Sequence, residues 1–365
     1  MKILLLADID SEHTEKWALG LAEKGISVGI FSFNKASYEW HQHNNITVFF
    51  EPEKMINAES TLTKLAYLKY VNVLKKIIKH FKPDILHAHY ATSYGLVGAL
   101  TGFHPFVISS WGTDVMKFPN KNFVAKSILK YNFKNADMLC ATSHTISEYI
   151  GKITRKKVEV VPFGINSEQF KPAKVDSLFK EQDYVIGTVK PMEKLYNQDI
   201  LIDAFAVLKP KYPHIKLLLV GNGTIEDKLK EKAKALNLEN EIVFTGRIPF
   251  AEVNKYYNMM KIMVNISEYE SFGVSVVEAM ACEIPVIVTN VGGLKEVVKD
   301  DSVGLKIDLP NVEQTVAALE RLINDKELYH QIAVNSRKHV LANYEWQLNL
   351  ASMIDLYNQL LKQEK

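Results

Sequence analysis

Two carboxylates eight residues apart, Glu270 and Glu278, are the feature of the sequence with the clearest chemical meaning. Glu270 stands just before a Ser-Phe-Gly turn, and Glu278 lies inside the apolar stretch VSVVEAMAC at 274–282, where a charge needs a partner. Free N–H groups at a helix start can hold an anion, and a carboxylate accepts hydrogen bonds from both hydroxyls of a diol. The segment therefore predicts a site for a nucleotide sugar, with diphosphate, diol and sugar in a row. The alternative is a helix-capping Glu270 and a solvated Glu278.

Other polar residues follow predicted strands, where ligands bind in open parallel sheets. His87 and His89 end the strand at 84–90, and we expect their side chains to point to opposite faces, so that only one enters the site. The GNG turn at 221–223 is a weak nucleotide signal, because further glycines and a downstream acid are missing. An ordinary tight turn explains Asn222 equally well.

The elements that must position these residues alternate between short β-branched, apolar runs and helical stretches, which is typical of a helix-flanked parallel sheet. The pattern restarts near residue 183. The predicted strands are 2–8, 27–33, 46–50, 84–90, 105–112, 138–143 and 158–164, then 183–189, 216–223, 241–246, 261–267, 285–290 and 303–308. The predicted helices include 11–25, 61–81, 124–135 and 144–152, then 197–213, 224–238, 275–283, 293–299, 312–325, 327–344 and 346–363.

The alternation predicts an α/β protein with two facing, doubly wound Rossmann-like domains and a cleft between them. We expect an N-terminal domain at 1–170, a linker at 171–182 and a C-terminal domain at 183–345. The helix at 346–365 is expected to pack back on the N-terminal domain.

Composition narrows the class further. The 365 residues are 47% hydrophobic and 24% charged with net charge +2, which suits a soluble globular protein and gives no sign of nucleic-acid binding. Only two cysteines occur, Cys140 and Cys282, so we expect a reducing, cytoplasmic setting without disulfides. The apolar run at 3–7 is too short for a signal peptide, and no run approaches the ~20 apolar residues of a membrane span.

Charge is uneven along the chain: residues 1–170 hold 20 Lys and Arg against 15 Asp and Glu. Part of this surplus lies on predicted helices that also carry Phe123, Leu129, Tyr131 and Ile77. Such a face predicts peripheral contact with an anionic membrane, with a merely solvated face as the alternative. The lysines concerned are Lys69, Lys75, Lys76, Lys79, Lys121, Lys126, Lys130 and Lys134.

The E-x7-E block, followed by AMAC-x-x-PV and by VGGLKEVV at 291–298, resembles the retaining GT-B glycosyltransferases of family 4. The segments VPFGINSEQFKP at 161–172, GTVKPMEK at 187–194 and LLLVGNG at 217–223 are similar to that family as well. The resemblance covers essentially the whole chain and is strongest over 155–346.

The resemblance implies that Glu278 holds the ribose hydroxyls and Glu270 the donor sugar. Where the family has an Arg and a Lys to neutralise the diphosphate, this chain has Lys190 and Lys194, and either fits the role of phosphate cation. Glu283 stands where the family usually has Gly, and we expect it to face solvent. The donor is also expected to meet Gly221, Asn222, Arg247, Ser271, Phe272, Gly273 and Val274.

In the N-terminal domain, the resemblance implies that His89 is the cleft histidine that contacts the donor sugar or phosphate. His13, Thr14, Gly112 and Asp114 are expected on the acceptor side. The loop after the first strand lacks the family's glycines, and its Asp8-x-Asp10 is interpreted as loop and cap chemistry. No spacing suggests a metal site, and no cofactor is expected.

The predicted function is metal-independent, retaining transfer of a sugar from a nucleotide diphosphate sugar, UDP favoured and GDP possible, to a hydroxyl acceptor. A glycan or lipid-linked acceptor in cell-surface glycan synthesis is expected, at the cytoplasmic membrane face. A sugar-nucleotide epimerase and a non-catalytic nucleotide-sugar-binding partner are the alternatives. The second would leave no reason for a carboxylate in the apolar helix, and a NAD-dependent enzyme would need a GxGxxG that is missing.

Overall fold

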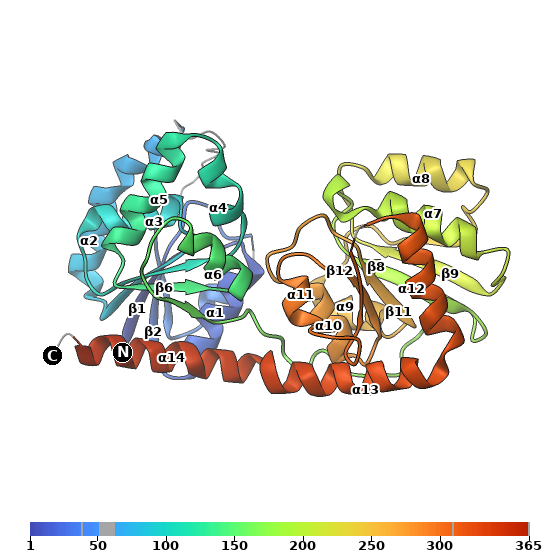
Figure 1. Ribbon diagram of the computed structural model, residues 1–365. Coiled ribbons are helices and arrows are strands. Elements are labelled where there is room, and N and C mark those ends of the chain that lie inside the picture. Colours follow the sequence, from blue (N-terminus) through green and yellow to red (C-terminus); the bar gives the residue numbers. More distant parts are fainter. Residues whose placement is uncertain (38, 51–62, 309, 364–365) are drawn as a thin grey trace. The chain divides into compact units, whose positions relative to one another are not determined.

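The computed structural model describes residues 1–37, 39–50, 63–308 and 310–363, and the chain divides into two compact units (Figure 1). Unit 1 comprises Met1–Phe163 together with Leu348–Lys365, and unit 2 comprises Gly164–Gln347. Each unit has its own parallel sheet and its own hydrophobic core.

Unit 1 is built on a sheet of parallel strands in the order β3-β2-β1-β4-β5-β6-β7, seven of them in the described part of the unit. The strand order reverses between β1 and β4, which is the switch point of a doubly wound sheet. The central strands are mostly apolar because both of their faces are buried, and their buried polar residues are His87 and His89 on β4 and Ser109 and Ser110 on β5. The strands are β1 (Lys2–Leu6), β2 (Ser27–Phe31), β3 (Ile46–Phe50), β4 (Ile85–His89), β5 (Phe106–Ser110), β6 (Met138–Ala141) and β7 (Val158–Val160).

Helices cover both faces of this sheet. One face packs against α2 (Val71–Phe81), α3 (Ser93–Thr101), α5 (Phe123–Asn135) and α6 (His144–Gly151), which share one core with Leu86 and Ala88 of β4. The other face packs against α1 (Glu12–Glu23) and α14 (Trp346–Gln363), and Figure 1 shows α14 on the side opposite to α2, α3 and α5. Shorter turns are η1 (Trp40–Gln42), η2 (Thr63–Tyr70), α4 (Thr113–Met116) and η3 (Phe118–Asn120).

Unit 2 repeats the same topology. Its described strands are parallel in the order β10-β9-β8-β11-β12-β13, and the order reverses between β8 and β11. The two sheets together confirm the predicted class of two Rossmann-like α/β domains. The strands are β8 (Tyr184–Val189), β9 (Ile215–Val220), β10 (Ile242–Phe244), β11 (Ile262–Asn265), β12 (Val286–Thr289) and β13 (Leu305–Ile307).

One face of this sheet forms a core with α7, α8 and α12, through side chains such as Phe205, Leu229 and Leu319. In addition, α10 packs against both α9 and α13. The helices and turns of unit 2 are η4 (Lys194–Tyr196), α7 (Gln198–Leu208), α8 (Glu226–Ala235), η5 (Phe250–Glu252), α9 (Val253–Tyr257), α10 (Val274–Ala281), α11 (Leu294–Val297), α12 (Val312–Asn324) and α13 (Lys326–Asn343).

Some predicted bounds differ from the structure. The predicted helix at 61–81 begins outside the described residues, and 63–70 is a 3-10 turn rather than α-helix. The segment predicted as a linker, 171–182, belongs to unit 2, where the Ala173 N–H donates to the side chain of Asn258 on the loop after α9. The sequence of this segment is polar and irregular, as in a linker. In the structure, however, the side-chain amides of Asn254 and Asn258 accept hydrogen bonds from its backbone and hold it against the rest of unit 2.

Candidate active site

Two of the predicted site residues of unit 2, Lys190 and Glu270, meet at the switch point of its sheet. Lys190 directly follows β8, and Glu270 lies in the loop between β11 and α10. Because β8 and β11 are parallel neighbours, both residues leave the same edge of the sheet. The order of the strands thus brings together two residues that are eighty positions apart.

Lys190 and Glu270 form a close ion pair, Nζ to Oε2. Their side chains are only 11% and 14% exposed, so the pair is largely withdrawn from water. The Lys190 ammonium also lies 4.9 Å from the ring centroid of Tyr196. Burial and next the charge of Glu270 raise the pKa of Tyr196 to about 12. The other candidate cation, Lys194, is exposed at the start of η4.

The loop that carries Lys190 is fixed by the glycine turn after β9. Lys190 N–H donates to the Val220 carbonyl at 3.0 Å, and Met192 N–H donates to the Asn222 carbonyl at 2.9 Å. Gly221 has φ +128°, and a Cβ at this position would collide with the Lys190 carbonyl. The GNG turn therefore positions Lys190 through backbone contacts, while the Asn222 side chain is exposed.

The loop that carries Glu270 is fixed by the VGG segment between β12 and α11. Gly293 N–H donates to the Glu270 carbonyl at 2.9 Å. A Cβ on Gly292, whose φ is +46°, would collide with the same carbonyl oxygen. Glycine is needed here because two loop backbones touch.

Helix α10 begins at Val274, four residues after Glu270, with Gly273 as its N-cap. Its first-turn N–H groups, including that of Val274, make the N-terminus electropositive. Phe272 is buried against Tyr344, with ring centroids 5.4 Å apart, and Ser271 is half-buried. Among the described residues, the buried Ser275 hydroxyl in this first turn has no hydrogen-bond partner. Ser275 was not predicted as a site residue, although its place in the first turn was a usable signal.

Glu278 is buried on α10, and the Tyr257 hydroxyl donates to its Oε2 at 2.8 Å. Burial, followed by the charge of Glu278, raises the pKa of Tyr257 well above its ordinary value. The prediction that this carboxylate has a partner is therefore correct, but one partner is a protein hydroxyl. The hydrogen bond from Tyr257 gives Glu278 a structural role in the apolar helix. The argument that only a catalytic or binding role explains this buried carboxylate therefore fails.

Arg247 lies beyond the edge strand β10 and is exposed. Its neighbour Gly246 accepts a hydrogen bond from Gly221 N–H at 3.1 Å, which brings this loop next to the glycine turn. Glu283 follows α10 in a left-handed conformation with φ +60°, a region that favours glycine. Its side chain is 41% exposed, and the nearest cation is Arg337, 3.9 Å away.

In unit 1, the rings of His87 and His89 lie 4.6 Å apart, so the prediction that they point to opposite faces is wrong. Residues two positions apart in a strand share a face. His87 is held between the Tyr357 hydroxyl on α14, at 2.6 Å from Nδ1, and Ser109 Oγ on β5, at 2.8 Å from Nε2. His89 is also buried, and its Nδ1 has no partner among the described residues.

His89 belongs to an aromatic cluster at the switch point of unit 1. Trp111 follows β5 and is half-buried. Its ring centroid lies 4.9 Å from that of His89 and 5.6 Å from that of His13. The His13 ring stacks on Phe163 at 3.9 Å. Thr14, the next residue after His13, is buried, and its hydroxyl has no hydrogen-bond partner in the described part of the chain. Trp111 is not among the predicted site residues and so was missed as a member of this group.

Burial governs the protonation of both histidines. It is the main cause that lowers the pKa of His89 to about 3, with the nearby His13 as the second cause. Burial and then the charge of Lys16 lower the pKa of His13 to about 4. Both imidazoles are therefore neutral near pH 7 and can hold a hydroxyl or a phosphate oxygen through a hydrogen bond.

Asp114 is fully buried and accepts hydrogen bonds from the backbone N–H groups of Ala91 and Gly112, both at 2.8 Å, and of Trp111 at 3.2 Å. These bonds join the loops after β4 and β5. Gly112 is likewise buried, as the N-cap of α4. Asp114 thus sets the backbone around Trp111, and its carboxylate has protein partners.

Asp8 accepts from Asp10 N–H at 3.1 Å within the loop after β1, and Asp10 accepts from Ser37 N–H in the loop after β2 at 3.0 Å. Within the described residues, no group of three or more His, Cys, Asp or Glu side chains is placed to hold a metal ion. Nor does any described helix combine the length and apolarity needed to cross a bilayer.

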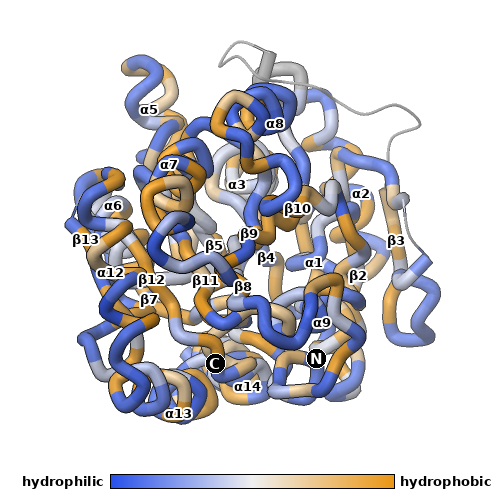
Figure 2. Tube along the Cα trace, turned by 90° about the vertical axis from the view of Figure 1, so that its right-hand side faces the viewer, coloured by the Kyte–Doolittle hydropathy of each residue, from blue (hydrophilic) through white to orange (hydrophobic). Residues whose placement is uncertain are grey.

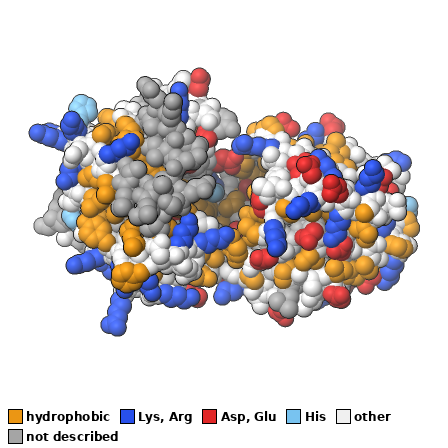
Figure 3. Space-filling model, turned by 90° about the horizontal axis from the view of Figure 1, so that it is seen from above, with side chains coloured by type: hydrophobic (Ala, Val, Ile, Leu, Met, Phe, Trp, Pro, Cys, Tyr) orange, Lys and Arg blue, Asp and Glu red, His pale blue; other side chains and the backbone are white. Residues whose placement is uncertain are grey.

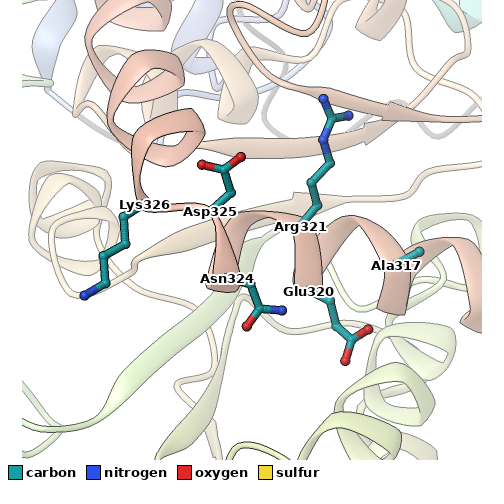
Figure 4. Close-up of a pocket in the computed structure, with 6 residues that line it drawn as sticks. All are labelled: Ala317, Glu320, Arg321, Asn324, Asp325 and Lys326. Carbon is teal, nitrogen blue, oxygen red and sulfur yellow. The ribbon is translucent and has the colours of Figure 1, made fainter.

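A shallow surface depression at the end of α12 contains none of the predicted site residues (Figure 4). Two of its charges are used in ion pairs, Arg321 with Asp301 at 2.8 Å and Glu320 with Lys211 at 2.6 Å. Figure 4 also shows that these two side chains point away from each other. The lining residues are Ala317, Glu320, Arg321, Asn324, Asp325 and Lys326.

Comparison with known protein families assigns the chain to a class of proteins. Residues 169–339 match the family model for glycosyl transferases group 1, and residues 2–143 match that for glycosyl transferase 4-like domains. The two matches cover both units, so the chain belongs to the group 1 glycosyltransferases, as the E-x7-E block predicted.

Individual proteins agree with this assignment. An uncharacterized glycosyltransferase of Methanocaldococcus jannaschii is 28% identical over 348 residues, which is 92% of this chain and 91% of the relative. The capsular polysaccharide biosynthesis glycosyltransferase CapM of Staphylococcus aureus is 28% identical over 258 residues, 66% of this chain and 67% of the relative.

Solved structures show the same GT-B fold. Sucrose-phosphate synthase from Thermosynechococcus elongatus superposes with a TM-score of 0.85 at 20% identity, over 100% of both chains. Anabaena HepE in complex with UDP and glucose superposes with a TM-score of 0.77 at 19% identity, over 99% of this chain and 100% of that one.

Proposed function

We propose that the chain transfers a sugar from a nucleotide diphosphate sugar to a hydroxyl acceptor with retention of the anomeric configuration. The observation that carries the proposal is the meeting of Lys190 and Glu270 beside the N-terminus of α10. An ammonium and a helix N-terminus suit a departing diphosphate, and a carboxylate suits sugar hydroxyls. Glu278, held by Tyr257, would take the ribose hydroxyls.

UDP is the favoured nucleotide, with GDP as the second choice. Support for UDP comes from the fold likeness to HepE, which was solved with UDP and glucose. Gly221 and Asn222 lie against the Lys190 loop, and Arg247 follows Gly246, which pairs with Gly221. A nucleotide that places its diphosphate on Lys190 would come close to this turn.

The proposed chemistry develops positive charge on the sugar and negative charge on the diphosphate. We assign Lys190, rather than a metal ion, to the neutralisation of the leaving group. Lys194, which is exposed in the same segment, would close on the outer phosphate. The acceptor attacks from the face that the diphosphate leaves, and the departing phosphate takes the acceptor proton. Because the His89 imidazole is neutral, it would hold the donor by a hydrogen bond and would transfer no proton.

For the acceptor, we propose a glycan or lipid-linked sugar in cell-surface glycan synthesis, met at the cytoplasmic face of a membrane. The relative CapM, named for capsular polysaccharide biosynthesis, supports this class. His13, Thr14 and Trp111 in unit 1 offer aromatic surface and a buried hydroxyl for it. Gly112 and Asp114 would act through the backbone that they fix.

The test is a thermal-shift screen with UDP-, GDP-, ADP- and CMP-sugars, followed by product analysis. A ligand at 100 times its Kd stabilises the folded state by about 2.7 kcal/mol, so the correct donor gives a clear rise in Tm. NMR of the product gives its anomeric configuration, and transfer in EDTA tests the assigned metal independence. If no nucleotide sugar raises Tm, the donor assignment fails; an inverted product overturns retention alone.

A further inference from the structure

The first turn of α5 in unit 1 exposes two adjacent apolar side chains. Phe123 is 82% exposed and Val124 is 52% exposed. The Asn122 side chain caps this helix by accepting from Ala125 N–H at 2.9 Å, which fixes the start of the helix at Phe123. Exposed large apolar residues that stand side by side on a fixed turn indicate an interaction surface.

The rest of the outer face of α5 is basic and aromatic. Ala125, Leu129 and Phe133 are buried against the core, so residues on the opposite side of the helix face water. Tyr131, at 41% exposed, lies two turns beyond Phe123 and Val124. We call the outward set the α5 patch; it consists of Phe123, Val124, Lys126, Lys130, Tyr131 and Lys134.

The sequence segment that carries the α5 patch has charges of a single sign. Residues 115–136 contain five lysines and no Asp or Glu. Helix α2 packs against α3, as α5 does, and its exposed Lys75, Lys76 and Lys79 extend the same charge. Figure 2 shows hydrophobic and hydrophilic residues alternating along α5, and Figure 3 shows blue Lys and Arg side chains beside orange hydrophobic ones on unit 1.

We propose that the α5 patch docks on the surface of a bilayer that contains anionic lipid. Phe123 and Val124 would enter the boundary between headgroups and acyl chains, while the lysine ammoniums stay at the level of the lipid phosphates. The charges are all lysine, which attracts a diffuse negative surface and lacks the bidentate geometry with which Arg reads one defined phosphate. The inference rests on the proposed function for its purpose, because it names the surface on which a lipid-linked acceptor would be met.

Co-sedimentation of the full chain with vesicles tests the proposal. Phosphatidylcholine vesicles with about 30% phosphatidylglycerol should bind the chain, and pure phosphatidylcholine should bind it at least tenfold more weakly. Each lysine near an anionic surface contributes about fivefold, so Lys126→Gln with Lys130→Gln should lower binding about 30-fold. Phe123→Ser with Val124→Ser should lower it by about tenfold or more, since the apolar anchor is lost.

Matched controls lie in unit 2. Lys228→Gln with Lys234→Gln removes the same charge from exposed positions on α8, and Val207→Ser removes an apolar residue of similar exposure on α7. Both should bind vesicles like the unaltered chain. All variants should keep the nucleotide-sugar Tm shift, so loss of vesicle binding and failure of the donor assignment are read separately.

Three results would overturn the proposal. These are equal binding to neutral and anionic vesicles, patch variants that sediment like the α8 control, and a chain that binds no vesicle at all. If the chain binds no vesicle but forms a dimer in analytical ultracentrifugation, and Phe123→Ser with Val124→Ser dissociates this dimer, the α5 patch is a surface that binds a second copy of the chain.

Discussion

Replacing Glu270 with Gln should have opposite effects on nucleotide binding and on sugar transfer. In the structure, Glu270 holds the Lys190 ammonium, which we assign to the diphosphate. An incoming diphosphate must therefore take Lys190 from Glu270 and approach a second negative charge. Glu270→Gln removes both obstacles and also the carboxylate proposed to grip the sugar.

The magnitude follows from the burial of the pair. Two unit charges at ~4 Å interact by about 4 kcal/mol at the effective dielectric of a protein surface, and desolvation offsets much of this gain. A hydrogen bond to a charged group is worth about 1.5–3 kcal/mol net. We expect the lower end of this range because both side chains keep some exposure. The Kd for UDP should therefore fall about tenfold. Transfer should fall by about two orders of magnitude.

Isothermal titration calorimetry with UDP and a transfer assay measure the two effects. Glu283→Gln is the matched control because it also removes a carboxylate of unit 2. Glu283 lies outside the Lys190 loop, and its Oε1 is 3.9 Å from Arg337 Nε, which is a looser pair than that of Glu270. Lys190→Ala should weaken UDP binding and transfer together. A folded Glu270→Gln chain that binds UDP within about twofold of the unaltered chain would show that Lys190 does not meet the diphosphate.

Three further outcomes follow from the structure. Tyr357→Phe leaves His87 Nδ1 buried without its partner and should cost about 1–3 kcal/mol in chemical denaturation, with faster amide exchange in α14; unchanged stability would refute the role of this bond. Glu283→Gly should raise the unfolding free energy by about 1 kcal/mol, since the residue has φ +60°, and a loss of stability would contradict the strain argument. Because the folded-state pKa of His13 is about 4 and its unfolded value is 6.5, the unfolded chain binds the extra proton between these values, and stability falls as pH drops from 6.5 to 4. His13→Asn should remove up to about 3 kcal/mol of that fall in pH-dependent denaturation, and an equal pH slope would rule the effect out.

Much of the site could be predicted because parallel strands gather their carboxyl ends. Lys190 and Glu270 follow adjacent strands, so topology alone brings them near each other. Which of Lys190 and Lys194 lies against Glu270 could not be predicted. It depends on the path of one loop, which is set by backbone bonds to Asn222 and by the close approach of Gly221.

Partners that come from distant elements were also beyond prediction. The apolar setting of Glu278 showed that it needs a donor, but nothing local identifies Tyr257, twenty-one residues earlier. Trp111 could not be predicted as a member of the unit 1 cluster because its packing depends on His13 of α1 and His89 of β4. The error for His87 and His89 was of another kind, since the period of two along a strand was sufficient to place both rings on one face.

The return of α14 to unit 1 has a consequence for how the protein is made. Leu350, Met353, Tyr357 and Leu360 are buried, and Tyr357 reaches a histidine of the fourth strand. As the chain leaves the ribosome, the part of the first sheet that α14 covers stays exposed until unit 2 has been synthesised. During synthesis, N-terminal domains usually fold before C-terminal ones. Here unit 1 is synthesised first, but it can complete its fold only after α14 has been made. A fragment that ends at residue 163 would lack the part of its core that α14 supplies, so an expressed N-terminal domain must include residues 348–363.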